Sequence, residues 1–279
     1  MPDFPIVDTH VHLIDRERLD YPWLQNVPAI DRDATLADYD GACGAVDVAA
    51  MVFVEVAVAP GQALAEAKFV AGLGDPRLAA IVAHAPLERG AAVEADLAAL
   101  AAIGPVRGVR RLLQGEADPE FCLRPAFLEG VRALRPFGFS FDICVTHRQI
   151  EAVVRFAERV PDVPLILDHI GKPAIAAGQM APWADAIKAL GAMEHVTLKL
   201  SGVATEANHD AWRPDDLMPF MEVAYGAFGP ARTMFGSDWP VSTLAIGYER
   251  WVDLVDGFVG PADAPAVFGE TARRVYRLA

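Results

Sequence analysis

The sequence has little positive charge. Lys and Arg number 24 against 38 Asp and Glu, which leaves a formal net charge of −14. A surface of that sign repels the phosphate backbone of nucleic acids and the anionic headgroups of membranes. We therefore expect neither nucleic acid nor a membrane as a partner. An anionic small molecule remains compatible with this balance, because a site can carry its own Arg and Lys.

Cysteine is also scarce, and long apolar runs are missing. Cys43, Cys122 and Cys144 are the cysteines among 279 residues, and they form no CxxC pair. This usage favours buried, reduced thiols and a cytoplasmic protein. The opening MPDFPIVDTHVHL lacks the basic-then-apolar order of a signal peptide. The most apolar stretch, Val48–Ala59, contains Glu55 and is shorter than the roughly 18 apolar residues of a membrane span.

Short apolar runs alternate with amphipathic segments along the whole chain. Eight runs lack polar alternation, which is typical of parallel strands buried on both faces: Ile6–His12, Met51–Ala57, Ala80–Ala85, Val106–Leu113, Phe139–Val145, Pro164–Ile170, Val196–Gly202 and Thr233–Val241. Helix-like spacing of apolar residues marks segments between them: Ala65–Leu73, Ala92–Ile103, Gln149–Val160, Asp185–Met193, Asp215–Phe228 and Tyr248–Phe258.

This alternation predicts an α/β fold, with residues 1–279 forming a single, distorted (β/α)8 TIM barrel. Such a barrel typically takes about 250 residues. Length alone also allows two domains of about 140 residues. Long loops are expected after the first and seventh runs, at Asp15–Asp33 and Thr205–Pro214. Long loops in compact domains are often functional.

The first run ends in His10 and His12, which are two residues apart. In this barrel the active site forms at the C-terminal ends of the strands. Residues two apart in an extended strand point to the same face, so both imidazoles are expected in the barrel mouth. Two neutral imidazoles side by side suit a divalent metal ion. The alternative is a pair of ordinary surface or core histidines.

Two later runs also end in titratable residues. Asp168 and His169 end the sixth run, and Asp238 ends the eighth. Because adjacent strand residues point in opposite directions, we expect His169 in the mouth and Asp168 packed behind it. Asp238 needs either a partner or solvent at the rim, since an unpaired buried carboxylate is costly. Together with His10 and His12, these residues predict one reaction centre.

With this constellation the chain resembles the amidohydrolase superfamily, in its amidohydrolase family 2. Within that family it looks like the lactonase branch that includes L-fuconolactonase, L-rhamnonolactonase, sulfomuconolactonase and pyrone-dicarboxylate lactonase. The motifs that carry the resemblance follow in order along essentially the whole chain: DTHVH (8–12), YPWL (21–24), RGVR (107–110), LRP (123–125), LDHIGKP (167–173), KLSG (199–202), FGSDWPV (235–241) and ARRVYRL (272–278).

The resemblance implies a hydrolase that opens a small lactone, with a sugar-acid lactone as the first choice, by attack of activated water. Asp238 is then the general base, and His10, His12 and His169 are catalytic with it. These four residues either hold one divalent cation, zinc in the first place, or the histidines act without metal as hydrogen-bond donors to the carbonyl oxygen. The choice stays open because the fifth run offers Asp142 where many superfamily members have a further histidine ligand.

Further residues are candidates for contact with the substrate. Arg110 can hold an acidic group through two parallel hydrogen bonds. Glu55 lies inside an apolar run, where carboxylates are rare; it is a metal ligand, a partner for a substrate hydroxyl, or the ion-pair partner of a barrel arginine. Lys199 complements either an anionic substrate or Asp238, unless it forms a buried structural ion pair. The set is completed by three residues for which packing is the alternative: His84, Arg124 and Trp239.

The same site is compatible with other reactions, because this barrel hosts many chemistries. Lactone isomerisation, decarboxylation and amide hydrolysis form one alternative. A non-catalytic, ligand-binding protein that keeps the site residues forms another. Converging titratable groups favour an enzyme over the last of these.

Overall fold

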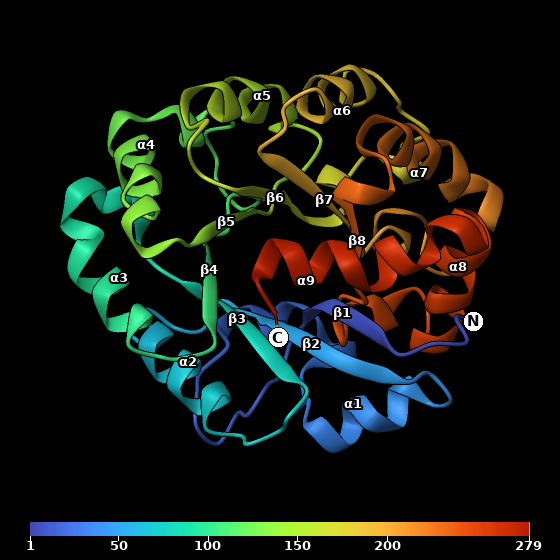
Figure 1. The fold of residues 1–279 in the computed structure, drawn as a ribbon, viewed down its shortest axis with the longest axis horizontal. Helices are drawn as coiled ribbons and strands as arrows, with labels where there is room; N and C mark the ends of the chain where they lie inside the picture. The colour runs from blue at the N-terminus through green and yellow to red at the C-terminus, as the bar shows by residue number, and fades with distance from the viewer. Residues whose placement is uncertain (279) are drawn as a thin grey trace.

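The computed structural model describes residues 1–278, and its parallel strands follow one another in chain order around a barrel (Figure 1). β8 returns to β1 through a parallel bridge between Val11 and Trp239, and the His12 amide donates to the Trp239 carbonyl at 2.8 Å. The predicted (β/α)8 barrel is thus confirmed. Its strands are β1 (Ile6–Val11), β2 (Val48–Val54), β3 (Leu78–His84), β4 (Val106–Arg110), β5 (Ser140–Ile143), β6 (Leu165–Leu167), β7 (Val196–Leu200) and β8 (Thr233–Phe235).

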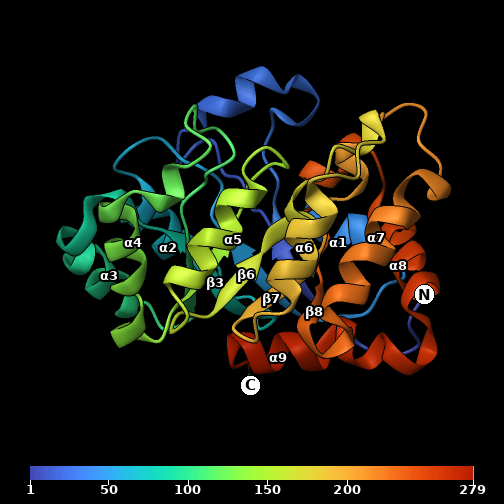
Figure 2. The same ribbon diagram turned by 90° about the horizontal axis from the view of Figure 1, so that it is seen from above.

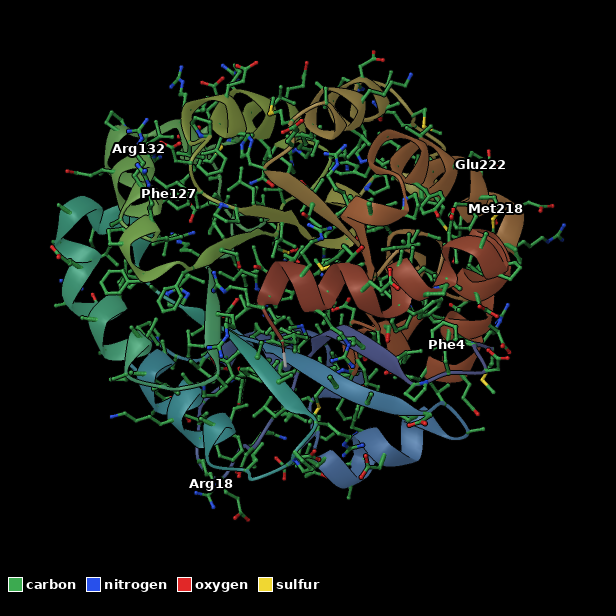
Figure 3. All side chains as sticks on the ribbon, in the orientation of Figure 1. Phe4, Arg18, Phe127, Arg132, Met218 and Glu222 are labelled. Atoms are coloured by element: carbon green, nitrogen blue, oxygen red, sulfur yellow. The ribbon has the colours of Figure 1, made fainter. Side chains whose placement is uncertain are left out.

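Helices cover the outside of the barrel, with apolar faces inward. Figure 3 shows Phe127 on the inner side of its helix and Arg132 at the outer edge, and Phe127 is fully buried. Helices were predicted for six of the segments below, but not for the first, fourth and last. The helices are α1 (Leu36–Cys43), α2 (Ala63–Ala71), α3 (Glu94–Ala101), α4 (Pro125–Arg132), α5 (Ile150–Arg159), α6 (Trp183–Gly191), α7 (Pro214–Phe228), α8 (Tyr248–Pro265) and α9 (Thr271–Tyr276).

The two ends of the barrel are closed differently. α9 lies across one end, while the segment that follows β1 lies at the other (Figure 2). From α9 the hydroxyl of Tyr276 reaches into the barrel and donates to the Asp142 carboxylate at 2.7 Å. The end that α9 leaves uncovered is the one where the strands finish, and the segment after β1 lies there. Within residues 1–278, none of the helices combines the length and apolar character that a membrane crossing needs.

Strands β6 and β8 stop earlier than the apolar runs predicted. After β6 the backbone turns through left-handed conformations, with φ of 53° at His169 and 43° at Lys172, and Asp238 after β8 has φ of 59°. A left-handed residue with a side chain costs roughly 1–2 kcal/mol. Such conformations concentrate at functional sites. The predicted runs extended to Ile170 and Val241, apolar residues that lie beyond the points where β6 and β8 end.

Candidate active site

The end of β1 places His10 and His12 in the barrel mouth, as predicted. His12 Nδ1 lies 2.8 Å from the Val54 carbonyl oxygen on β2. Because a carbonyl oxygen only accepts, Nδ1 carries the hydrogen and Nε2 presents its lone pair to the mouth. His10 Nδ1 lies 3.4 Å from Asp168 Oδ1 and 3.4 Å from Lys199 Nζ. Its Nε2 lies 3.3 Å from Arg110 Nη1 and 3.7 Å from Asp238 Oδ1.

The imidazoles of the mouth converge on one carboxylate oxygen. Asp238 Oδ1 lies 3.4 Å from His12 Nε2, 3.7 Å from His10 Nε2 and 3.9 Å from His169 Nε2. His169 is oriented from behind, with Nδ1 2.9 Å from Ser201 Oγ. A lone pair on His12 Nε2 that faces a carboxylate oxygen is repelled by it, unless a proton or a metal ion lies between them. The geometry therefore calls for a cation at this point.

The protonation states suit a metal ion. Burial lowers the pKa of His169 to about 4 and holds the pKa of His10 well below its ordinary value. Burial alone raises the pKa of Asp238, but the surrounding imidazoles outweigh it and keep that pKa below its usual range. The site thus offers neutral imidazoles and an ionised carboxylate, the forms that bind metals. The potential ligand atoms of His10, His12 and Asp238 lie within 4.8 Å of one another, so these residues fit a divalent ion.

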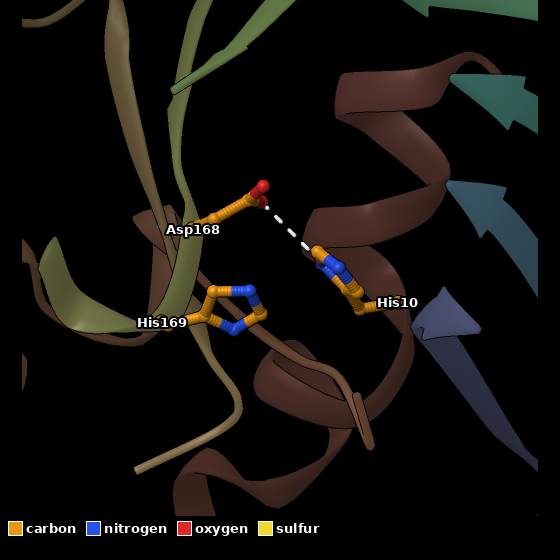
Figure 4. A group of neighbouring side chains, drawn as sticks. All are labelled: His10, Asp168 and His169. Atoms are coloured by element: carbon orange, nitrogen blue, oxygen red, sulfur yellow. Dashed lines mark ion pairs between the residues drawn. The ribbon is translucent and has the colours of Figure 1, made fainter. Parts of the chain in front are cut away.

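Asp168 and His169 both face the barrel interior, so the prediction that they point in opposite directions is wrong (Figure 4). β6 ends at Leu167, and Asp168 and His169 belong to a 3-10 turn in which strand alternation no longer applies. Asp168 lies behind His10, with Oδ1 3.4 Å from His10 Nδ1, rather than behind His169. His10, Asp168 and His169 also bring potential ligand atoms within 4.8 Å of one another.

A chain of buried ion pairs lies beneath these residues. Lys199 Nζ contacts Asp142 Oδ2 at 2.6 Å and Asp168 Oδ1 at 3.1 Å. Arg110 contacts Glu55 Oε1 at 2.7 Å and Asp168 Oδ2 at 3.3 Å. Glu55 and Lys199 are fully buried and do not line the mouth. The structure thus shows, for both residues, the ion pairs that were the alternative to direct contact with substrate.

A cavity of about 200 Å³ opens above the convergence point. This space suits a small, single-ring ligand better than a drug-sized one, which takes about 300 Å³ or more. Its wall includes His12, His169 and Asp238, together with Trp23, Arg110 and Lys172. Lys172 was not singled out from the sequence, although it belongs to the LDHIGKP motif. Its place in the wall depends on the left-handed turn after β6, which the sequence pattern does not reveal.

Three predicted substrate contacts lie elsewhere. His84 lines a neighbouring cavity of about 540 Å³ rather than the one above Asp238. Arg124 is exposed at the surface, where it pairs with Asp118 at 2.9 Å. The Trp239 ring is buried against Tyr39, with ring centroids 5.4 Å apart, and it does not line the cavity. Each of these positions corresponds to the packing alternative or to a different cavity.

Asp8 is a site-supporting residue that the sequence reasoning missed. Its carboxylate accepts hydrogen bonds from the Ser237 amide at 2.8 Å and from the hydroxyls of Tyr39 and Tyr248 at 2.9 and 3.1 Å. The Ser237 bond ties β1 to the segment after β8 that carries Asp238, and the tyrosine bonds tie β1 to α1 and α8. The available signal was a carboxylate inside an apolar run, two residues before His10.

Comparison with known proteins places this architecture in a family. The sequence profile of the amidohydrolase family matches residues 7–278. The chain belongs to the amidohydrolase family. An L-fucono-1,5-lactonase of Burkholderia multivorans is 34% identical to this amidohydrolase over 289 residues, which cover 98% of this chain and 96% of the relative. Another, from Burkholderia ambifaria, is 37% identical over 193 residues, or 66% of each protein.

Solved structures agree with this assignment. An amidohydrolase of Burkholderia multivorans with bound zinc matches this amidohydrolase with a TM-score of 0.87 at 32% identity, covering 99% of this chain and all of the other (100%). The resemblance to the lactonase branch, predicted from the motifs, is confirmed by the curated lactonases. A divalent metal ion at the centre agrees both with the zinc-bound structure and with the donor set in this chain.

Proposed function

We propose that this protein is a lactonase that opens a small sugar-acid lactone at the barrel mouth. It is a hydrolase acting on a cyclic ester, in keeping with its family and its lactonase relatives. The observation that carries the mechanism is the convergence of three imidazoles on Asp238 Oδ1 at the floor of a cavity of about 200 Å³. A single-ring lactone matches that space.

In the proposed reaction a water molecule attacks the lactone carbonyl carbon and gives a proton to the Asp238 carboxylate. The carbonyl pair moves onto oxygen as the new C–O bond forms. When this pair returns, the ring C–O bond breaks and the ring oxygen takes up the proton held by Asp238, which gives a hydroxy acid and restores the Asp238 carboxylate. Arg110, at the cavity wall, orients the substrate through the edge of its guanidinium.

His10, His12 and Asp238, with His169 beside them, are the residues that would hold the divalent ion, and zinc suits their imidazole-rich set. A bound divalent ion lowers the pKa of water and polarises a carbonyl group. That chemistry matters here because a carboxylate with a lowered pKa is a weak base. Asp238 can serve as the base only if the attacking water has a lowered pKa.

Acid release from a panel of 1,4- and 1,5-lactones, followed with a pH dye in weak buffer, tests the proposed function. We expect turnover of sugar-acid lactones above that of simple aliphatic lactones. A folded protein that opens none of them contradicts the proposal. Carbon dioxide release or a ring isomer detected by NMR would instead point to decarboxylation or isomerisation.

Metal removal gives a separate prediction. Protein purified without added metal should contain about one divalent ion per chain by elemental analysis. Chelation should abolish lactone opening and lower Tm, because a ligand that binds only the folded state stabilises it. Zinc should restore both better than magnesium. Full activity and an unchanged Tm in metal-free protein would support catalysis by the histidines alone.

Gly202 offers a test of how tightly the centre is held. It has φ of +56°, and an added Cβ would lie 2.7 Å from His169 Nδ1 and 2.8 Å from Asp238 Oδ2. We expect Gly202→Ala to displace both groups and to lower kcat by about 10²-fold, the typical effect of a misplacement near 1 Å. Gly178→Ala is the matched control, because Gly178 has φ of +62° in open space. Equal kcat in both variants would contradict the prediction.

A further inference from the structure

Lys172 is the charged residue of the cavity wall that the mechanism above leaves unused. It ends four consecutive left-handed residues, with φ of 53°, 48°, 73° and 43° at positions 169 to 172. Its carbonyl accepts a hydrogen bond from the His147 amide at 3.0 Å, which holds the turn. The side chain lies in the wall with only 16% of its surface exposed. A strained backbone that delivers an ammonium group into the cavity calls for a role for that group.

Most of the N–H donors of the Lys172 ammonium have no partner within residues 1–278. Its ion pair within residues 1–278 is with Glu206, and that contact is long, with Nζ 3.5 Å from Oε1. An ammonium group has three N–H donors. At least two of them are therefore available to a molecule in the cavity.

The other polar groups of the wall are less suited to bind a developing negative charge. Most of the guanidinium donors of Arg110 are already engaged, since they contact the Glu55 carboxylate at 2.7 Å, the Glu55 carbonyl at 2.5 Å, and Asp168 and His10 Nε2 at 3.3 Å each. Cys144 also lines the cavity, but burial raises the pKa of its thiol to about 11. It stays uncharged at neutral pH and is a weak donor.

We propose that the Lys172 ammonium stabilises the negative charge that develops on the lactone carbonyl oxygen, and that Glu206 positions the ammonium. The inference rests on the proposed lactone hydrolysis. As water adds to the carbonyl carbon, the π pair moves to oxygen and the water proton moves to Asp238. Lys172 supplies charge-assisted hydrogen bonds to that oxygen and keeps its own protons. When the pair returns, the ring C–O bond breaks and the interaction weakens again.

The electrostatics of the site favour this role over proton donation. Burial alone lowers the pKa of the Lys172 ammonium, but Cys144 and the carboxylates of Glu206 and Asp238 outweigh burial and hold that pKa above its ordinary value. A group that keeps its proton so firmly is a poor general acid. It is well suited to act as a fixed positive charge beside the oxygen on which negative charge develops.

The test combines turnover with binding of two stable lactone analogues. Lys172→Met should lower kcat by about 10²–10³-fold, the usual effect of losing one preorganised oxyanion donor, with little change in KM. A cyclic phosphonate mimics the tetrahedral, anionic addition species, whereas a lactam mimics the planar, neutral substrate. By calorimetry, Lys172→Met should weaken binding of the phosphonate at least about tenfold and leave the lactam unchanged. Lys172→Arg should keep part of the turnover and part of the phosphonate affinity. Glu206→Gln should lower kcat more than it changes KM.

Lys68→Met is the matched control, because Lys68 is exposed on α2. Thermal unfolding of each variant checks the fold, and Lys172→Arg and Glu206→Gln keep the test decisive if Lys172→Met is unstable. Equal weakening of phosphonate and lactam, or no effect on kcat, overturns the inference. If the wild type opens no lactone but binds the phosphonate through Lys172, the proposed function fails while the anion-binding role of Lys172 stands.

Discussion

Replacement of Asp238 by Asn is expected to lower kcat for lactone opening by about 10³-fold, within the range that general-base catalysis contributes. The amide keeps the size of the side chain but cannot accept the proton of the attacking water. Because Asp238 Oδ1 is also the point on which the three imidazoles converge, the change removes the negative charge from the centre. The variant should remain folded, since the shape of the side chain is retained.

Two measurements separate the roles of Asp238. Metal content by elemental analysis shows whether the carboxylate is needed to hold the ion, and turnover at saturating zinc shows whether it is needed beyond that. We expect kcat to stay low even when the metal content is restored. Asp185→Asn, an exposed carboxylate on α6, is the control and should behave like the wild type. Near wild-type turnover by Asp238→Asn would remove Asp238 from the mechanism.

The sequence was sufficient to predict the barrel and the two histidines at the end of β1. The alternation of apolar runs and amphipathic segments depends on burial, which repeats along the chain and can be read locally. His10 and His12 share a face because a strand has a period of two. Both inferences hold because they use only the geometry of a regular element. α9, in contrast, is six residues long, too short for its periodicity to be recognised.

The parts of the centre that could not be predicted depend on turns and on register. Asp168 and His169 share a side because the strand ends before them. Lys172 reaches the cavity for the same reason. The pairing of Glu55 with Arg110 joins β2 to β4 across the barrel interior, and no local pattern specifies which arginine a buried carboxylate will meet. Prediction from one sequence therefore identified which strands carry the centre, but neither where β6 and β8 end nor which charged residues pair.

The largest effect on stability is expected at Lys199. Its ammonium is fully buried and shared by Asp142 and Asp168 at 2.6 and 3.1 Å. Lys199→Met removes the charge and retains most of the volume, so both carboxylates are left without this partner. Breaking a buried ion pair on one side costs about 3–5 kcal/mol. We expect a loss of this size in the free energy of unfolding, measured by urea denaturation at pH 7, and no such loss in Lys188→Met, which is exposed on α6.

A double variant distinguishes a lost charge from lost packing. In Lys199→Met with Asp142→Asn, one of the two carboxylates that lost the Lys199 ammonium becomes a neutral amide. Removing both partners of a buried pair is less harmful than removing one. We therefore expect the double variant to recover part of the stability that Lys199→Met loses. A double variant less stable than Lys199→Met would show that packing around the Lys199 stem, and not the charge, is responsible.

The pH dependence of the same variant has a definite sign. Burial alone raises the pKa of Asp168, but Lys199 and His10 outweigh it and hold the folded-state pKa well below its ordinary value. A carboxylate of this kind stabilises the fold above its unfolded pKa of about 3.9, and that contribution is lost as the pH falls toward the folded pKa. Without Lys199 the buried carboxylates bind protons more readily in the folded state. Acidification therefore raises the unfolding free energy of the variant. The gap in unfolding free energy between wild type and Lys199→Met should therefore narrow from pH 7 to pH 4. A gap that stays constant over this interval would mean that the ion pairs beneath the mouth do not stabilise the barrel.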